Sequence, residues 1–61
     1  MIVMSKNRLH VYRITNICVD DNDVVTFING KRVVLGTYEK PYEVLKEIER
    51  KQNLFIMPLY K

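Results

Sequence analysis

The stretch Val24–Ile48 reads VVTFINGKRVVLGTYEKPYEVLKEI, and its first half has the composition of a β-hairpin. Asn29-Gly30 lies between two runs rich in β-branched residues, and both residues tolerate the positive φ that a type I′ turn requires. After Gly36 the hydrophobic period changes from that of a strand to that of a helix. The stretch therefore predicts a small α+β fold in which a hairpin runs directly into one helix.

The register of the hairpin depends on the length of its turn. We expect Lys31 to join the turn as a third residue with a bulge, which places Phe27 opposite Val33 and gives one continuous apolar face. A strict two-residue turn would pair Phe27 with Arg32 instead and bury a less apolar set of side chains.

The helix is predicted from Pro41 to about Lys51, because proline suits the first helical position, where its missing N–H would be unbonded in any case. Lys40 is a poor N-cap, so we expect that Thr37 or a side chain from elsewhere caps the helix, or that its first turn frays. The apolar residues form one narrow stripe, made of Val44, Leu45 and Ile48.

The residues before the hairpin are expected to add strands. Ile2–Met4 is a short apolar run, and Arg8–Ile14 alternates between apolar and polar residues. This alternation predicts a buried face and an opposite face, made respectively of Leu9 and Val11, and of Arg8, His10 and Tyr12. Thr15-Asn16 interrupts the pattern, either as a bulge in one long strand or as a turn between two strands.

The acidic segment Asp20–Asp23 is predicted to be a solvated turn, since Asp and Asn bond to their own backbone and are poor strand formers. Its alternating oxygen side chains also resemble the start of a calcium loop. However, the later glycine and glutamate that an EF-hand loop requires are missing, so we expect no metal here.

The chain is predicted to close with a last strand, Leu54–Met57, which Pro58 ends. Because this run is apolar on both sides, we expect it to be covered on both faces or to lie in an interface. The fold expected over residues 1–61 is a single α+β domain: a small antiparallel sheet of four to five strands, one α-helix packed on it and a short C-terminal strand.

The short chain has few means of stabilising itself. Sixty-one residues enclose only a small core, and the lone Cys18, expected to be a buried apolar residue, excludes an internal disulfide. One cysteine and one histidine also exclude a zinc site. We therefore expect a homo-oligomer, a dimer or higher. No apolar run is long enough for a signal peptide or a membrane span, so a cytoplasmic location in the host cell is expected, without a membrane partner.

No arrangement of residues indicates catalysis or a cofactor. His10, the only histidine, has no Ser, Cys or carboxylate placed by sequence to form a catalytic pair, so the chain is not expected to be an enzyme. A net charge of +3 is weak for a phosphate binder. Single-stranded nucleic acid is therefore a minor hypothesis, which needs one sheet face to carry Arg8, His10, Tyr12, Lys31 and Arg32.

The segment Leu35–Pro58 resembles a family of very short proteins encoded by bacteriophages and prophages of Gram-positive bacteria. The resemblance rests on Leu35-Gly36-Thr37-Tyr38, on Val44-Leu45-Lys46-Glu47-Ile48 and on Phe55-Ile56-Met57-Pro58, with Asn16-Ile17 matching an upstream Asn-Ile. It implies an accessory role, in which such proteins bind and inhibit a host or antiviral-defence protein, or instead sequester a nucleotide signal.

Two sets of residues are candidates for binding. For a protein partner, the surplus of hydrophobic residues near the C-terminus and the exposed polar strand face suggest Phe55, Met57, Leu59, Tyr60, Arg8, His10 and Tyr12. For a small ligand held at a subunit interface, the available phosphate-gripping side chains are Arg13, Arg32 and Tyr38.

Overall fold

A computed structural model describes all residues 1–61 and confirms the predicted α+β class, with one helix packed on small sheets and a short C-terminal strand. The strands number six and form two sheets. In chain order the elements are β1 (Ile2–Met4), β2 (Val11–Arg13), β3 (Cys18–Asp20), β4 (Asp23–Ile28), β5 (Lys31–Thr37), α1 (Pro41–Glu49) and β6 (Leu54–Ile56).

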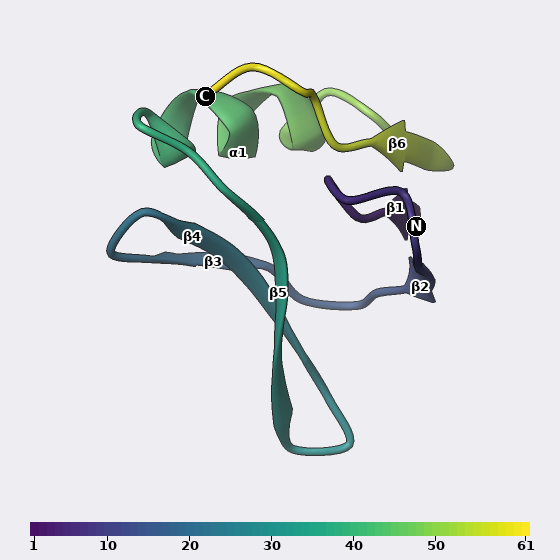
Figure 1. Cartoon of the computed structure of the whole chain (residues 1–61). Coiled ribbons are helices and arrows are strands. Elements are labelled where there is room, and N and C mark those ends of the chain that lie inside the picture. The colour runs from purple at the N-terminus through teal and green to yellow at the C-terminus, as the bar shows by residue number, and fades with distance from the viewer.

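The two sheets have three strands each. Sheet A has the strand order β2-β1-β6, in which β1 runs antiparallel to β2 and parallel to β6. Sheet B has the order β3-β4-β5 and is antiparallel throughout. In Figure 1, sheet A lies at the right, sheet B crosses the centre and left, and α1 lies above sheet B. The chain therefore begins in sheet A, builds sheet B, and returns to sheet A through the helix.

One hydrophobic core joins both sheets and the helix. Its nine buried residues come from sheet A, from sheet B with the segment after it, and from α1. They are Val3, Ile14, Val24, Leu35, Tyr38, Val44, Ile48, Phe55 and Met57. Because every element except β3 contributes a core residue or is directly followed by one that does, neither sheet has a core of its own.

The hairpin between β4 and β5 closes with a two-residue turn. Asn29 and Gly30 have φ values of 53° and 79°, as the Asn-Gly pair predicted. The expected register is wrong, because Phe27 pairs with Arg32 and not with Val33. With both turn residues at positive φ, the turn needs no third residue, so Lys31 belongs to the strand.

An irregularity further along the hairpin sets which side chain is buried. Val25 pairs with Val34 and Val24 pairs with Gly36, which leaves Leu35 as an extra residue on β5. The side chain of Leu35 is 1% exposed and joins the core. The bulge therefore turns the side chain of Leu35 into the core. The predicted register placed a bulge at the turn, whereas the structure has it further along the hairpin.

Helix α1 begins with Pro41 at its first turn, as predicted, and ends at Glu49, two residues before the expected end. No side chain caps its N-terminus. The expectation for Thr37 is wrong, because its hydroxyl donates to the carboxylate of Asp23 at 2.6 Å. At nine residues, α1 is too short and too polar to cross a membrane.

Thr15-Asn16 forms a turn, which settles the choice between turn and bulge. The turn carries the chain from β2 in sheet A to β3 in sheet B. The side-chain amide of Asn16 donates to the carbonyl of Phe27 at 3.0 Å and accepts from its N–H at 2.8 Å. Asn16 thus takes the place of a strand beside the end of β4.

Candidate protein-interaction surface

The strand pairing of sheet A assigns its side chains to two faces. Val3 lies between Tyr12 and Phe55, and this row points into the core. Because side chains alternate along a strand, the two flanking rows point to the other side. We call these six residues the outer face of sheet A; they are Arg13, Ile2 and Leu54 in one row and Val11, Met4 and Ile56 in the other.

Five of the six residues of the outer face are aliphatic or thioether side chains, and solvent reaches them. Val11, Leu54 and Ile56 are 58%, 56% and 51% exposed, and Ile2 is 38% exposed. Helix α1 packs on β3 and β4, so it does not cover this face. A contiguous apolar patch on adjacent strands is typical of a protein-protein contact, whereas single exposed apolar residues are ordinary.

The charges of the chain are divided between its two parts. Residues 1–14 and 50–61, which form sheet A and its flanking segments, hold six Lys or Arg and no Asp or Glu, a formal charge of +6. Residues 15–49 hold four basic and seven acidic residues, a formal charge of −3. The outer face of sheet A therefore lies in a wholly basic part of the molecule.

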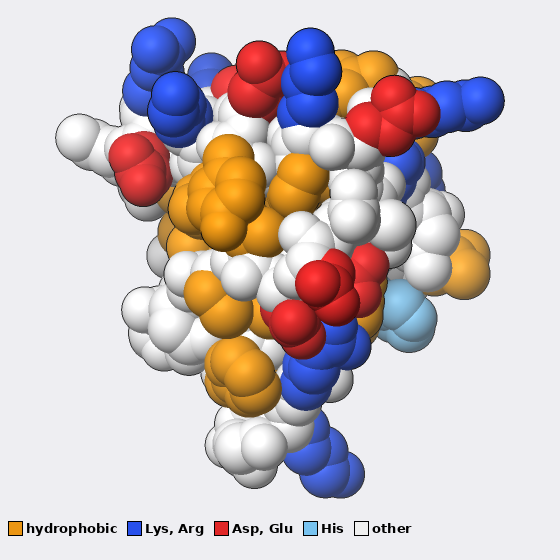
Figure 2. Space-filling model, turned by 90° about the vertical axis from the view of Figure 1, so that its left-hand side faces the viewer, with side chains coloured by type: hydrophobic (Ala, Val, Ile, Leu, Met, Phe, Trp, Pro, Cys, Tyr) orange, Lys and Arg blue, Asp and Glu red, His pale blue; other side chains and the backbone are white.

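The opposite part of the molecule carries charges of both signs. Figure 2 views the side that is at the left in Figure 1, where acidic and basic side chains adjoin one another and apolar side chains stand in separate groups. Arg32 makes ion pairs at 3.0 Å with Asp20 and at 2.9 Å with Asp23. The hydroxyl of Thr37 and the guanidinium of Arg32 lower the pKa of the Asp23 carboxyl. On sheet B, Arg32 therefore pairs with both aspartates, and Lys31 is the one charged side chain of this sheet without an ion pair.

The prediction for Arg8–Ile14 assigned the faces wrongly. Leu9 and Val11, expected inside, are exposed, and Tyr12 packs against the core. The reason is that a turn occupies the first part of this segment, with Arg8 at φ 66°, and the strand begins only at Val11. The pairing of Val3 with Tyr12 then carries Tyr12 to the inner face.

Arg8 and His10 lie near the outer face without belonging to it. A guanidinium nitrogen of Arg8 donates to the carbonyl of Met57 at 2.7 Å, which ties the first loop to the segment after β6. The ring of His10 lies 5.8 Å from that of Tyr12, centroid to centroid. Both side chains are exposed, and Arg8 adds a positive charge beside the Val11 end of the sheet.

The C-terminal residues predicted to bind a partner separate into two pairs. Phe55 and Met57 are core residues, at 7% and 0% exposure, so the prediction is corrected for these two. Leu59 is exposed. Tyr60 is half-exposed, and its hydroxyl donates to Glu47 at 2.6 Å, which raises the pKa of Tyr60 to about 12.

The residues proposed to grip a phosphate are not brought together within the chain. Arg13 lies on β2 of sheet A, and Arg32 lies on β5 of sheet B, where two aspartates already bind it. Tyr38 is buried, donates its hydroxyl to the carbonyl of Pro58 at 2.7 Å, and has its pKa raised by burial to about 12. One chain therefore offers no phosphate pocket built from these three side chains.

Two further expectations are corrected by the placement of sheet B. Cys18, expected to be buried, is exposed and pairs with Val25. The shared face required for nucleic-acid stacking does not form, because Lys31 and Arg32 lie on sheet B while Tyr12 faces the core. No group of three or more His, Cys, Asp or Glu residues is placed to hold a metal ion.

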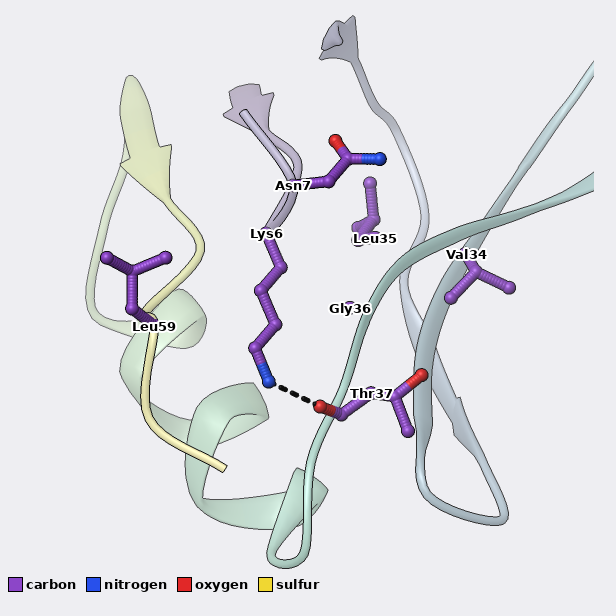
Figure 3. A pocket seen from close by; sticks show the side chains of 7 residues that line it. All are labelled: Lys6, Asn7, Val34, Leu35, Gly36, Thr37 and Leu59. Atoms are coloured by element: carbon purple, nitrogen blue, oxygen red, sulfur yellow. Dashed lines mark hydrogen bonds between the residues drawn. The ribbon is translucent and has the colours of Figure 1, made fainter. Parts of the chain in front are cut away.

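A shallow hollow of about 500 Å³ lies between β5 and the C-terminal tail (Figure 3). Lys6 is the one charged side chain lining it, and its ammonium group donates to the carbonyl of Thr37 at 2.7 Å. The same ammonium lies 4.1 Å from the centroid of the Tyr38 ring. Because groups of the chain itself bind the Lys6 ammonium, we interpret the hollow as part of the packing between the two sheets. We call this region the joint between the sheets.

The residues of the outer face were missed because an alternating pattern does not show which side is inside. The sequence did show that Leu54–Met57 is apolar on both sides and therefore needs two covers. The core covers Phe55 and Met57, which leaves Leu54 and Ile56 without a cover in the single chain.

No protein family, curated protein or solved structure matches this chain.

Proposed function

We propose that this chain is a non-enzymatic binding protein that docks the outer face of sheet A on another protein. The observation that carries the proposal is the uncovered double row of apolar side chains on β1, β2 and β6. Burying such a patch in an interface yields a favourable hydrophobic free energy of roughly 25 cal/mol per Å² of apolar surface. We accordingly propose recognition of a partner's surface in place of chemistry on a substrate.

The biological role we propose is that of a phage or prophage accessory protein. The resemblance of Leu35–Pro58 to short phage proteins supports a host or antiviral-defence protein as the target, inhibited by occupation of its surface. We also propose that the chain is a homo-oligomer, as expected from its small core. The experiment described next measures the number of subunits. Sequestration of a nucleotide signal loses its support within one chain, since Arg13, Arg32 and Tyr38 lie apart.

The test is native mass spectrometry of the untagged protein purified from its host cells. It reads the subunit number and the mass of any bound protein in one spectrum. The informative variant is Leu54→Ser with Ile56→Ser, which removes two exposed side chains of the outer face. The matched control is Phe27→Ser, because Phe27 is a similarly exposed apolar residue (47%) on sheet B.

We expect the double variant to fold and its affinity for the bound protein to fall at least about tenfold. The reason is that two apolar contacts at the centre of an interface, at roughly 1 kcal/mol each, together exceed the roughly 1.4 kcal/mol of a tenfold change. The Phe27→Ser control is expected to retain the bound protein. Equal retention in the double variant and the wild type, or equal loss in the control, would contradict the proposal.

A further inference from the structure

We infer that the partner presents an amphipathic α-helix whose apolar stripe is bordered by acidic side chains. This inference rests on the proposed function and concerns the chemistry of the partner at the same outer face of sheet A. It follows from three features of the molecule: the dimensions of the face, the way in which its own helix covers sheet B, and the division of charge.

The dimensions of the face suit a helix. Three strands about 4.8 Å apart place the outermost strands, β2 and β6, roughly 10 Å from each other. An α-helix with its side chains is about 10 Å wide. One helix is therefore wide enough to span the three strands.

The molecule contains an example of this kind of cover. Helix α1 packs on sheet B through a narrow stripe, and its buried residues are Pro41, Val44 and Ile48. Three apolar anchors on a nine-residue helix are thus enough to pack against two neighbouring strands of a three-stranded sheet in this chain. Sheet A has an equal number of strands and no helix on its outer side.

The charges around the outer face determine which side chains the partner needs beside its apolar stripe. Arg13 belongs to the outer face, is exposed and makes no ion pair. Beside the same end of the sheet, an open cleft is lined by Ile14 and by one charge of each sign, Lys51 and Glu49. We therefore take Arg13 as the basic border at this end. Arg8 lies near the other end, so basic groups border the apolar rows on two sides. Carboxylates on the partner would meet these charges and raise both affinity and the rate of association.

The charge and the side-chain composition of the outer face argue against three other occupants. A second copy of the chain, packed face to face, would bring two parts of charge +6 together. Single-stranded nucleic acid needs aromatic rings to stack on, and the rings of Tyr12 and Phe55 belong to the inner row. A membrane surface is favoured by Trp and Tyr at its level, and the outer face carries no aromatic side chain.

The test uses a displayed library of helical peptides of about 14 residues, roughly four turns. Every peptide carries an apolar stripe, and the positions that border the stripe are randomised between Glu and Lys. Selection is made on the full chain. A selected Glu-bordered peptide and its Lys-bordered twin are then titrated against the wild type, Ile56→Ser and Arg13→Glu by fluorescence anisotropy. Lys31→Glu is the control, because it makes the same charge reversal on an exposed residue of sheet B.

We expect selection to enrich Glu over Lys at the bordering positions. Affinity for the Glu-bordered peptide should fall about tenfold with Ile56→Ser, by a smaller factor with Arg13→Glu, and not at all with Lys31→Glu. Enrichment without a preference for Glu, or equal affinity for wild type and Arg13→Glu, would overturn the inference.

Other outcomes identify a different occupant and also overturn it. These are a homodimer that Ile56→Ser dissociates, or binding to vesicles of mixed phosphatidylserine and phosphatidylcholine that Arg13→Glu abolishes while no peptide is enriched. A host protein that is lost with Leu54→Ser and Ile56→Ser, but that contacts the face through a non-helical or basic segment, would leave the proposed function standing and remove only this inference.

Discussion

Sheets A and B have the same number of strands, yet they treat their outer sides differently. On sheet B, Arg32 bridges two aspartates across the outer side and Asn16 occupies the edge beside Phe27. On sheet A, two rows of apolar side chains have neither a cover nor a charge partner. Sheet B also exposes Phe27 and Val34, but it places ion-paired side chains among them, whereas the outer face of sheet A has no ion pair. Under our proposal, this difference makes the outer face of sheet A the one that another molecule covers.

The largest expected effect separates the two faces of β6. Phe55→Ala should lower the free energy of unfolding by about 3–5 kcal/mol, because Phe55 belongs to the core. A chain of this length has a total stability of only about 3–9 kcal/mol, so this variant approaches unfolding. The neighbouring Ile56→Ala should cost far less, since Ile56 is half-exposed. Urea denaturation of both variants measures the difference.

Phe55→Leu keeps this comparison measurable if Phe55→Ala does not fold. We expect its stability to lie between those of the wild type and Phe55→Ala, because less of the core volume is removed. If Ile56→Ala lowered the stability of the chain as much as the change at Phe55, the two faces of sheet A would be equally buried and the outer face would not be free.

The second effect concerns the joint between the sheets. A Cβ at Gly36 would lie 2.8 Å from Cε2 of Tyr38 and 3.0 Å from Cβ of Lys6, closer than Cβ atoms normally approach. Gly36→Ala should therefore destabilise the chain by about 1–3 kcal/mol through overpacking. The control Val34→Ala, on the same strand and partly exposed, should change stability by less than about 0.5 kcal/mol. A neutral Gly36→Ala in thermal denaturation would show that the joint yields easily.

Local features of the fold were predictable, and the pairing of distant strands was not. The Asn29-Gly30 turn and Pro41 at the helix start depend on the backbone preferences of those residues. By contrast, β1 pairs with β6 across most of the chain, and each strand has only three residues. Strands this short carry little periodicity, so the sequence does not specify which sheet they join.

The candidate surface was predicted in part for the same reason. The C-terminal run was correctly identified as apolar on both sides, but Phe55 and Met57 were chosen for binding in place of Leu54 and Ile56. A one-residue change of register moves every side chain to the opposite face. Only the pairing of Val3 with Phe55, which no local pattern encodes, decides which half of the run faces outward.

The third effect is an alkaline instability of the contacts that hold the C-terminal tail. Tyr38 and Tyr60, whose rings lie 5.7 Å apart, each have a pKa raised from 10.0 to about 12, by burial and by the bond to Glu47 respectively. Because the unfolded chain releases these protons first, their contribution to stability is complete below pH 10 and is lost as the pH rises towards 12. Thermal denaturation across this range, with tyrosinate absorbance as a second signal, measures the loss.

Tyr60→Phe separates the two tyrosines, because it removes the bond to Glu47 and leaves Tyr38 in the core. We expect a smaller alkaline loss of stability in this variant than in the wild type. An unchanged alkaline transition would assign the whole effect to Tyr38 and would leave Tyr60 free to contact a partner together with Leu59.

The smallest effect tests the ion pairs that Arg32 makes with Asp20 and Asp23 on sheet B. The pKa of Asp23 is lowered from 3.8 by bonds from Thr37 and Arg32, so its contribution is present above pH 3.8 and is lost as the pH falls below that value. Arg32→Met keeps a long side chain over the sheet and removes the charge. Its midpoint of thermal unfolding should lie slightly below that of the wild type at neutral pH and converge with it in acid. High salt should also reduce the difference, because these groups are largely exposed.

Ile56→Ser should show neither dependence, since the outer face of sheet A contributes no ion pair. If the deficit of Arg32→Met persisted unchanged in acid, Arg32 would act by covering the apolar residues of sheet B, and the contrast between the two sheets would rest on packing instead of charge.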